Sequence, residues 1–416
     1  MNESLRQLLS EARRASRCLN RKSTEEIDHL LMSLADEVEK SADSILEANS
    51  RDLARMDDSN PKYDRLRLSR ERIADIASGI RNVAALPSPL NRTLAEWTQP
   101  NGMHIRKTTV PFGVIGIIYE ARPNVTLDVA SLCLKSGNTC LLKGGSDAEF
   151  SNRALTKVIA RVLVDAGFPE ACVSLLPSDH ATTKELLQSV GFVDLVIPRG
   201  SRRLIEFVRE NAQVPVIETG AGVCHCYFHS SGNLAMGKAI VENAKTRRVS
   251  VCNALDCLLI DRDRLQDLPA LVEPLAAHNV TLYADADAHS ALSGKYPLLE
   301  HARDDDFGKE FLDYKMSIRV VNGMEEALNH IALYSSKHSE SIIADDNGAC
   351  TMFEQEVDAA CVYANLPTSF TDGGQFGFGA EIGISTQKLH ARGPMALPEM
   401  TTYKYIVTGN GQIRKP

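Results

Sequence analysis

Cys252 is the residue of this chain whose type and setting point most directly to chemistry. Three cationic side chains precede it closely, those of Lys245, Arg247 and Arg248. Positive charge nearby favours the thiolate, which is the nucleophilic form of a cysteine. The alternative is that Cys252 is a small core residue, the usual fate of a free thiol. On this stretch alone both interpretations stay open.

Two glycine-containing turns are suited to an anionic cofactor. Lys143, Gly144 and Ser146 lie at an expected strand-to-helix turn, where glycine lets a ligand approach the backbone and a helix N-terminus favours anions. Gly200 and Ser201 lie at a second turn of this kind. The alternative is that both are ordinary strand-to-helix turns. Neither the Walker A order nor a Gly-x-Gly-x-x-Gly fingerprint is present. No sequence motif therefore supports a standard dinucleotide site.

Three further residues and one loop are candidates for chemistry. The amide of Asn124 is a neutral donor suited to an oxyanion hole, and the alternative is an N-cap of the following helix. Glu218 is suited to a general base or to positioning a cofactor, and the alternative is a structural carboxylate. His338 is interpreted as structural, with a catalytic dyad as the alternative. Residues 370–383 contain five glycines within eleven residues, and a loop of this kind is usually functional.

The triplet Cys224, His225 and Cys226 raises the question of zinc. In a strand, Cys224 and Cys226 would share one face and His225 would point the other way, so the three cannot easily bind one ion. No second Cys/His pair has zinc-site spacing, and Cys252 and Cys257 are also poorly spaced. We therefore expect no metal site.

The length, composition and charge are those of an ordinary soluble globular protein. Its 416 residues are too many for one hydrophobic core, so two or three domains are expected. A net charge of −8 gives no support to a nucleic-acid partner. Ten scattered cysteines indicate reduced thiols rather than a disulfide framework. There is no secretory signal pattern and no apolar run near the ~20 residues that span a bilayer, so a cytoplasmic location without membrane contact is expected.

The hydrophobic pattern predicts helices up to about residue 86, including one over 25–53 that Ser23 would cap. Asn101 and Gly102 predict a hairpin turn within residues 94–110. Alternating strands and helices follow, with short apolar runs typical of buried parallel strands. The expected strands are residues 113–119, 139–143, 172–176, 192–197 and 214–218, and then 255–260, 280–284, 317–321, 341–344 and 360–363. Residues 285–309 are expected to be irregular. The pattern predicts an α/β protein with two doubly wound units joined near residue 222.

Several segments, taken in order, resemble a known family. They are Val-Pro-Phe-Gly-Val-Ile-Gly at 110–116, Glu-Ala-Arg-Pro-Asn at 120–124, Leu-Lys-Gly-Gly at 142–145, Glu-Thr-Gly-Ala-Gly at 218–222, Val-Cys-Asn-Ala at 251–254, Phe-Gly-Phe-Gly-Ala-Glu-Ile-Gly at 376–383 and Ser-Thr-Gln-Lys-Leu-His-Ala-Arg-Gly-Pro at 385–394. This set resembles the gamma-glutamyl phosphate reductase family of the aldehyde dehydrogenase superfamily, over nearly the whole chain.

The resemblance implies an NADPH-dependent reductase that converts L-glutamyl 5-phosphate to L-glutamate 5-semialdehyde in proline biosynthesis. It implies an NADPH-binding domain in residues 1–222, a catalytic domain in 223–365, and a part in 366–416 that returns to the first domain. The hairpin and a strand near 401–407 would serve oligomerisation, as a dimer or tetramer. A complex with glutamate 5-kinase is a further implied partner. The alternatives are a hydrolytic NAD(P)-dependent aldehyde dehydrogenase and a non-enzymatic nucleotide-binding relative.

The resemblance also implies roles for individual residues. Cys252 would be the nucleophile, and Asn124 with the backbone N–H of Cys252 would hold the oxyanion. Substrate would contact Arg122, Arg248 and Phe376. The residues implied to bind the cofactor are Lys143, Gly144, Ser146, Gly200, Ser201, Glu218 and Glu310.

Two departures from the family pattern matter. Ser369 stands where the family usually has an arginine, so another cation must bind the substrate anion, and Arg122 is the candidate. Arg247-Arg248-Val249-Ser250 stands where Gln-Arg-Pro-Ser is common, which keeps charge and loses a stiff proline. Neither change removes a group that the chemistry needs.

Overall fold

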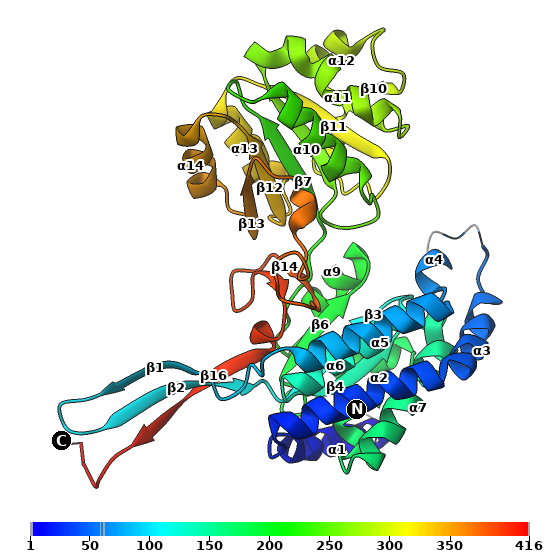
Figure 1. Ribbon diagram of the computed structural model, residues 1–416, viewed down its shortest axis with the longest axis vertical. Coiled ribbons are helices and arrows are strands. Elements are labelled where there is room, and N and C mark those ends of the chain that lie inside the picture. The colour runs from blue at the N-terminus through cyan, green and yellow to red at the C-terminus, as the bar shows by residue number, and fades with distance from the viewer. Residues whose placement is uncertain (1–2, 59, 61–62, 415–416) are drawn as a thin grey trace. The chain divides into compact units, whose positions relative to one another are not determined.

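The protein is described by a computed structural model that covers residues 3–58, 60 and 63–414 (Figure 1). The chain forms two compact units. Unit 1 comprises Met1–Thr219, Gly377–Gly383 and Met395–Pro416, and unit 2 comprises Gly220–Phe376 and Ile384–Pro394. Within the described ranges, no helix is both long and apolar enough to cross a membrane.

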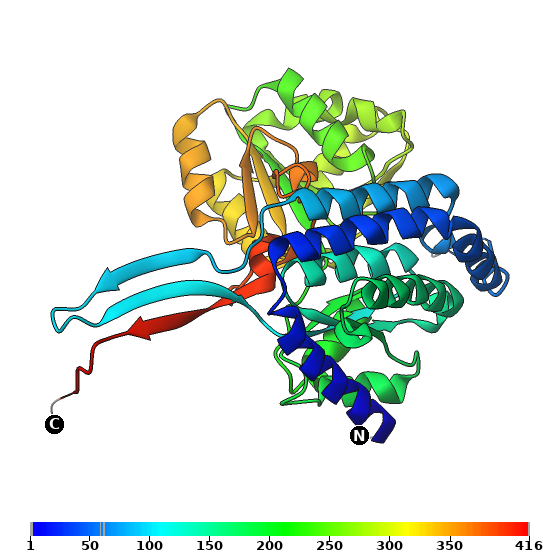
Figure 2. The ribbon, with the colours of Figure 1, turned by 60° about the horizontal axis from the view of Figure 1, so that its bottom comes forward.

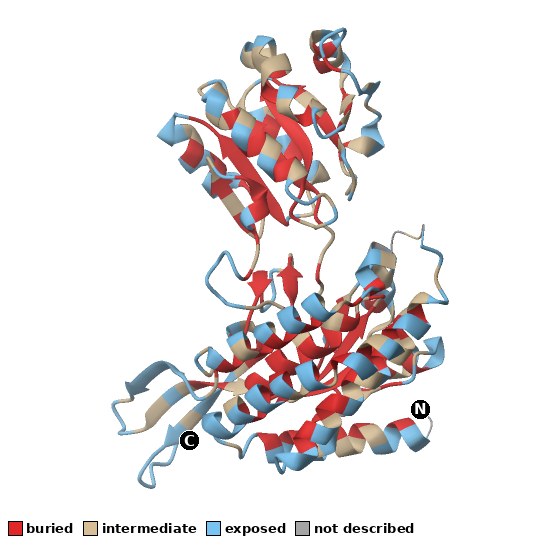
Figure 3. Ribbon diagram, turned by 45° about the vertical axis from the view of Figure 1, so that its right-hand side comes forward, coloured by how far each residue is buried: buried red, intermediate tan, exposed pale blue. Residues whose placement is uncertain are grey.

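Unit 1 contains a parallel sheet of four strands in the order β5-β4-β3-β6. The strands are β3 (Val114–Tyr119), β4 (Thr139–Gly144), β5 (Val173–Leu175) and β6 (Leu195–Arg199). β3 and β4 are buried along their whole length, as their continuous apolar runs predict (Figure 3). The expected strand at 214–218 is wrong, because only a single bridge from Val216 to Val196 forms. Pro215 has no N–H to donate to a ladder.

Helices cover both faces of this sheet. They are α1 (Glu3–Leu19), α2 (Thr24–Lys40), α3 (Ala42–Leu53), α4 (Tyr63–Leu66), α5 (Arg70–Ala85), α6 (Pro123–Lys135), α7 (Glu149–Asp165), α8 (His180–Leu187) and α9 (Arg202–Asn211). Leu9 of α1, Leu186 of α8 and Val208 of α9 pack into one core with the sheet. The single helix expected over 25–53 is in fact two, broken at Ser41, while the cap at Ser23 is confirmed.

A three-stranded antiparallel sheet extends away from the helices of unit 1 (Figures 1 and 2). It consists of β1 (Thr93–Thr98), β2 (His104–Pro111) and β16 (Thr401–Thr408). The hairpin turn uses Gly102 at a φ of +83°, a conformation that glycine adopts without strain. Trp97 packs edge-on against Tyr405. The predicted hairpin is therefore confirmed.

Unit 2 contains seven strands, all parallel, in the order β10-β9-β11-β8-β7-β12-β13. They are β7 (Cys224–Phe228), β8 (Leu255–Asp261), β9 (Thr281–Ala284), β10 (Leu299–His301), β11 (Lys315–Val321), β12 (Ser339–Ile343) and β13 (Cys361–Ala364). A separate two-stranded sheet consists of β14 (Gly383–Ser385) and β15 (Gly393–Met395).

The helices of unit 2 form two layers. α10 (Leu234–Thr246), α11 (Leu268–Ala276) and α12 (Ala286–Leu292) share a core with one face of the sheet. α13 (Met324–Tyr334) and α14 (Asn347–Glu356) share a core with the other face. The doubly wound prediction is confirmed. The expectation that residues 285–309 are irregular is wrong, since Asp285 caps α12 and β10 follows.

The buried side chain of Asn49 joins α3 to the segment around Leu66 and Leu68. Its buried amide donates to the carbonyl of Leu66 at 2.9 Å and accepts from the N–H of Leu68 at 2.8 Å. Asn49→Ala would leave both backbone groups unpaired and should lower the free energy of unfolding by about 2 kcal/mol or more. Urea unfolding followed by circular dichroism measures this. The exposed Asn20→Ala is the control, and equal midpoints for the two variants would contradict the prediction.

Candidate active site

Cys252 lies in the turn that precedes β8 of unit 2. His338, which precedes β12, places Nε2 3.2 Å from the Cys252 sulfur. Of the other nine cysteines, eight are buried and Cys18 is exposed, whereas Cys252 is partly exposed. An accessible thiol beside an imidazole is the arrangement of an activated cysteine nucleophile.

His338 is held by a chain of hydroxyl groups. Its Nδ1 lies 2.8 Å from the Ser339 hydroxyl, which lies 2.5 Å from the Thr371 hydroxyl. The Thr371 hydroxyl in turn lies 2.7 Å from that of Tyr363. Burial lowers the pKa of His338 to about 4, so the imidazole is neutral near pH 7. A neutral imidazole in this position can accept the proton of the Cys252 thiol.

The backbone at Cys252 is packed against Gly222. A Cβ atom at Gly222 would lie 1.5 Å from the Cys252 carbonyl oxygen, so no side chain fits there. The N–H of Gly222 donates to the Glu310 carboxylate at 2.9 Å. The thiol of Cys224 donates to the Cys252 carbonyl at 3.3 Å, and burial raises the pKa of this thiol well above its usual range. Glu310 thus contacts the backbone of Gly222, which itself packs against the backbone of Cys252.

The residue after the cysteine ties this turn to the segment that precedes the glycine loop. Asn253 is buried, and its amide donates to the carbonyls of Ser369 at 3.3 Å and Thr371 at 3.0 Å. Its own carbonyl accepts from the Thr368 hydroxyl at 2.8 Å. The Ser369 hydroxyl donates to Asn243 at 2.8 Å. Ser369, which stands where the resembled family pattern has an arginine, therefore makes an internal hydrogen bond in this chain.

The three cations before Cys252 have different surroundings. Lys245 is buried, and its ammonium lies 3.7 Å from the Asp256 carboxylate. Burial lowers the pKa of Lys245 and raises the pKa of Asp256 to about 7. Arg247 and Arg248 are exposed. Their predicted effect on the Cys252 thiolate stays a prediction.

In unit 1, the first predicted cofactor turn lies at the carboxyl end of β4. Lys143 is buried, and its ammonium donates to the Gly144 carbonyl at 3.4 Å. Burial lowers the pKa of Lys143, against the opposing charge of Asp179. A Cβ at Gly144 would lie 2.2 Å from the Asn152 amide, which explains the glycine. Ser146 is exposed at the start of a short 3-10 helix.

The second predicted turn lies at the N-terminus of α9. Ser201 caps this helix, and its N–H and hydroxyl donate to the Glu120 carboxylate at 2.9 and 3.1 Å. A Cβ at Gly200 would lie 2.8 Å from the same carboxylate. Glu120 therefore occupies the anion position of this helix N-terminus. Glu218 is half-buried and lies 3.9 Å from Arg209.

Asn124 is the second residue of α6. Arg122 is the N-cap and Pro123 the first helical residue, so the N-cap alternative for Asn124 is wrong. The Asn124 amide instead donates to the Asp128 carboxylate at 2.9 Å, and burial raises the pKa of Asp128 to about 6. Phe376, in unit 2, is exposed.

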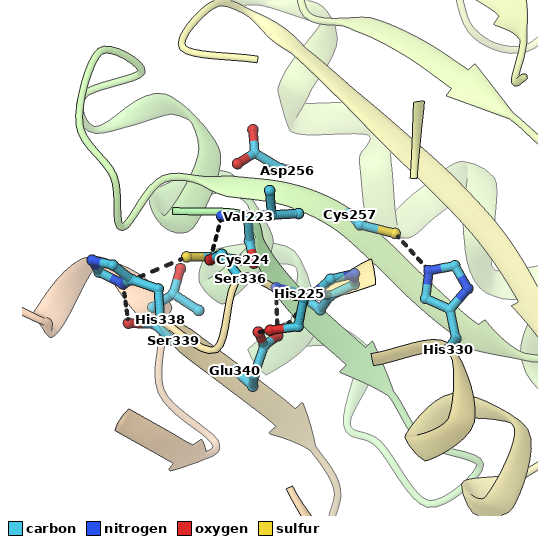
Figure 4. A network of polar contacts seen from close by, with 12 residues as sticks. Val223, Cys224, His225, Asp256, Cys257, His330, Ser336, His338, Ser339 and Glu340 are labelled. Atoms are coloured by element: carbon cyan, nitrogen blue, oxygen red, sulfur yellow. Dashed lines mark hydrogen bonds and ion pairs between the residues drawn. The ribbon is translucent and has the colours of Figure 1, made fainter. Parts of the chain in front are cut away.

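The alternation predicted for Cys224, His225 and Cys226 is confirmed. Cys226 lies in the core that faces α10 to α12, whereas His225 points to the other face, where Nδ1 lies 3.0 Å from the Glu340 carboxylate (Figure 4). The three therefore do not converge on one point.

The sequence interpretation took His338 as structural and did not predict its contact with Cys252. His338 follows Cys252 by 86 positions, and the contact exists only because β8, β7 and β12 pair in parallel. The available signal was a histidine directly before a strand of the same α/β unit as the candidate nucleophile.

Comparisons with known proteins identify the family of this chain. The model of the aldehyde dehydrogenase family matches residues 2–287. A gamma-glutamyl phosphate reductase of Parabacteroides distasonis is 61% identical over 412 residues, which cover 99% of each chain. The crystal structure of a gamma-glutamyl phosphate reductase from Thermotoga maritima is 40% identical, with a TM-score of 0.95, over 99% of this chain and 100% of that one. An acetylating aldehyde dehydrogenase from Geobacillus thermoglucosidasius shares the fold, at 16% identity, with a TM-score of 0.70 over 100% of this chain and 98% of that one.

Gly222→Ala tests the packing behind the thiol. The new Cβ would collide with the Cys252 backbone and displace it, so alkylation of Cys252 by iodoacetamide should slow by about tenfold or more. Peptide mass spectrometry after timed labelling measures the rate. Gly79→Ala is the matched control, because nothing lies within 4 Å of a Cβ there. Labelling of both variants at the wild-type rate would show that the contact does not position the thiol.

Proposed function

The chain belongs to the aldehyde dehydrogenase family and, within it, to the gamma-glutamyl phosphate reductases, and from this premise we propose that Cys252 carries the substrate acyl group as a thioester. The enzyme reduces glutamyl phosphate, a small-molecule substrate, in proline biosynthesis with a nicotinamide cofactor. The observation that carries the thioester proposal is the 3.2 Å contact between His338 and the partly exposed sulfur of Cys252.

The first step forms the thioester. His338 accepts the thiol proton, and the sulfur of Cys252 attacks the acyl carbon of the substrate. The carbon–sulfur bond forms, and phosphate leaves with the electron pair of the broken carbon–oxygen bond. The oxyanion that develops before this cleavage needs preorganised N–H donors. The family resemblance assigns this role to Asn124 and to the backbone N–H of Cys252.

The second step converts the thioester to the aldehyde. When bound, the nicotinamide cofactor supplies the hydride that the thioester carbon receives. The resulting thiohemiacetal collapses, and the sulfur of Cys252 leaves with the electron pair. This sulfur takes back the proton that His338 has held. No residue has to activate water, because phosphate is the leaving group.

NADPH is the cofactor that we propose from the family resemblance, and the two predicted turns of unit 1 differ in how they would receive it: the Lys143 turn suits an anion, whereas the Ser201 turn does not suit a 2′-phosphate. Lys143 is buried with a long hydrogen bond, so its ammonium keeps donors for the adenosine end. The N–H of Ser201 is less available to a cofactor, because it already donates to the Glu120 carboxylate. A ribose hydroxyl can share that carboxylate, whereas a 2′-phosphate would be repelled by it. Glu218 and Glu310 keep their predicted cofactor roles.

Further assignments stay proposals. Arg122, Arg248 and Phe376 are proposed to contact the substrate. The three-stranded sheet is proposed to mediate self-association into a dimer or tetramer, because its outer strands expose aromatic side chains such as Trp97 and Tyr405. A complex with glutamate 5-kinase and a cytoplasmic location also stay predictions.

Phosphate dependence separates the reductase from a hydrolytic aldehyde dehydrogenase. We expect oxidation of glutamate semialdehyde, with NADP⁺ or NAD⁺ compared, to require phosphate, because phosphate must release the thioester. Turnover that does not depend on phosphate would favour the hydrolytic alternative.

Cys252→Ser tests the nucleophile. This variant should retain less than about one hundredth of the wild-type rate while still binding NADPH, measured by fluorescence. Failure of the wild-type thiol to react stoichiometrically with iodoacetamide, with no NADPH protection, would favour a non-enzymatic relative.

His338→Asn replaces the proposed base with a neutral amide that cannot accept a proton. We expect kcat to fall by about 10²- to 10⁴-fold with little change in KM. Alkylation of Cys252 should also slow near pH 7 and approach the wild-type rate well above pH ~8.5, where solvent deprotonates a thiol. The exposed His278→Asn is the control. An unchanged pH profile of alkylation would show that His338 does not take the thiol proton.

A further inference from the structure

A second cluster of potential ligands lies in the core of unit 2. His225 of β7, Cys257 of β8 and His330 of α13 each offer one ligand atom, and these atoms lie within 4.8 Å of one another. All three side chains are buried. They surround a point on the face of the sheet that packs against α13 and α14, opposite to the face that Cys226 helps to cover.

The strand register sets up this cluster. The pairing of β7 with β8 shifts register between Cys224 and His225. His225 therefore lies opposite Cys257, whereas an unshifted register would place it opposite Asp256. Residues directly opposite on parallel neighbours point to the same face, which brings the imidazole and the thiol together. His330 of α13 then reaches the pair from the helical layer, with its ring 5.4 Å from that of His225.

The spacing of two of the atoms suits one zinc ion. The Cys257 sulfur lies 3.6 Å from Nε2 of His330. In tetrahedral coordination, Zn–S bonds of ~2.3 Å and Zn–N bonds of ~2.1 Å place sulfur and nitrogen about 3.6 Å apart. The pair therefore needs little rearrangement to bind a common ion.

His225 supplies an independent indication. Its Nδ1 lies 3.0 Å from the Glu340 carboxylate, whereas its Nε2 is buried without a hydrogen-bond partner among the residues that the structure describes. Figure 4 shows the His225 ring between Glu340 and the Cys257–His330 pair. A carboxylate behind a histidine is the usual support of a metal ligand, because it fixes the tautomer that leaves the other nitrogen free to bind.

The charges also suit a divalent ion. One zinc ion, one thiolate and the Glu340 carboxylate sum to zero, which an apolar core requires. Phe307 and Phe353 belong to this core. Two imidazoles and one thiolate form a donor set that zinc accepts.

We propose that His225, Cys257 and His330 form a three-ligand zinc site in unit 2, with Glu340 orienting His225. The ion would tie α13 to β7 and β8, and it would lie on the opposite side of β7 from Cys224. The expectation of no metal site depended on spacing along the chain, which does not reveal ligands brought together by strand register.

Competition with a chromogenic zinc chelator tests the site in the full chain. The background is Cys252→Ser, so that the reactive thiol binds nothing. We expect this metal-free protein to take up one equivalent of Zn²⁺, and the further change Cys257→Ala to weaken binding by about tenfold or more. Cys350→Ala is the matched control, because Cys350 lies in the same core cluster and is not a ligand. Uptake well below one equivalent, or equal binding by both double variants, would overturn the proposal.

X-ray absorption at the zinc edge provides a test that does not depend on the folding of a variant. The zinc-loaded Cys252→Ser protein should show one sulfur at about 2.3 Å and two imidazole nitrogens. Two or more sulfur ligands, or none, would overturn the assignment to these three residues.

Discussion

The register of three parallel strands is the constraint on which the site depends. Cys252 precedes β8, His338 precedes β12, and β7 lies between these strands and pairs with both. The 3.2 Å contact between sulfur and imidazole is therefore a product of two strand pairings rather than of local sequence. A slip of one residue in β12 would turn His338 to the other face of the sheet and remove the base from the thiol.

The same register divides the chemistry of unit 2 between two faces. Along β7, Cys224 contributes a hydrogen bond to the Cys252 carbonyl, whereas the next residue, His225, faces α13 and Glu340. Glu340 accepts from both the N–H and the ring of His225, at 2.8 and 3.0 Å, so it holds β12 against β7 from within the core. A buried carboxylate is tolerated only with such partners. The pair that keeps β12 in register thus also keeps His338, two residues earlier, at the sulfur.

Much of the architecture could be predicted because it follows from local patterns. Continuous apolar runs identified β3 and β4, and Asn101 with Gly102 identified the hairpin. The failures have physical causes. Pro215 interrupts a run that otherwise looks like a strand. β10 is only three residues long and mostly exposed, so it carries no clear period. The prediction that Cys252 is the nucleophile came from its local setting and family motif. The partners of Cys252 and His225 were not, because His338 and Cys257 reach them only through strand pairing.

The position of the thiol bears on the role that we propose for the imidazole of His338. A low thiol pKa commonly comes from a helix N-terminus, but α10 ends at Thr246, shortly before Cys252, and a helix C-terminus carries partial negative charge that opposes a thiolate. We propose that His338 acts by proton transfer instead. Burial keeps its imidazole neutral, and a neutral imidazole nitrogen at the sulfur can accept a proton as the carbon–sulfur bond forms. A buried imidazolium is a strong acid, so it also returns the proton readily when the sulfur leaves. One neutral histidine can in this way serve both the attack and the release.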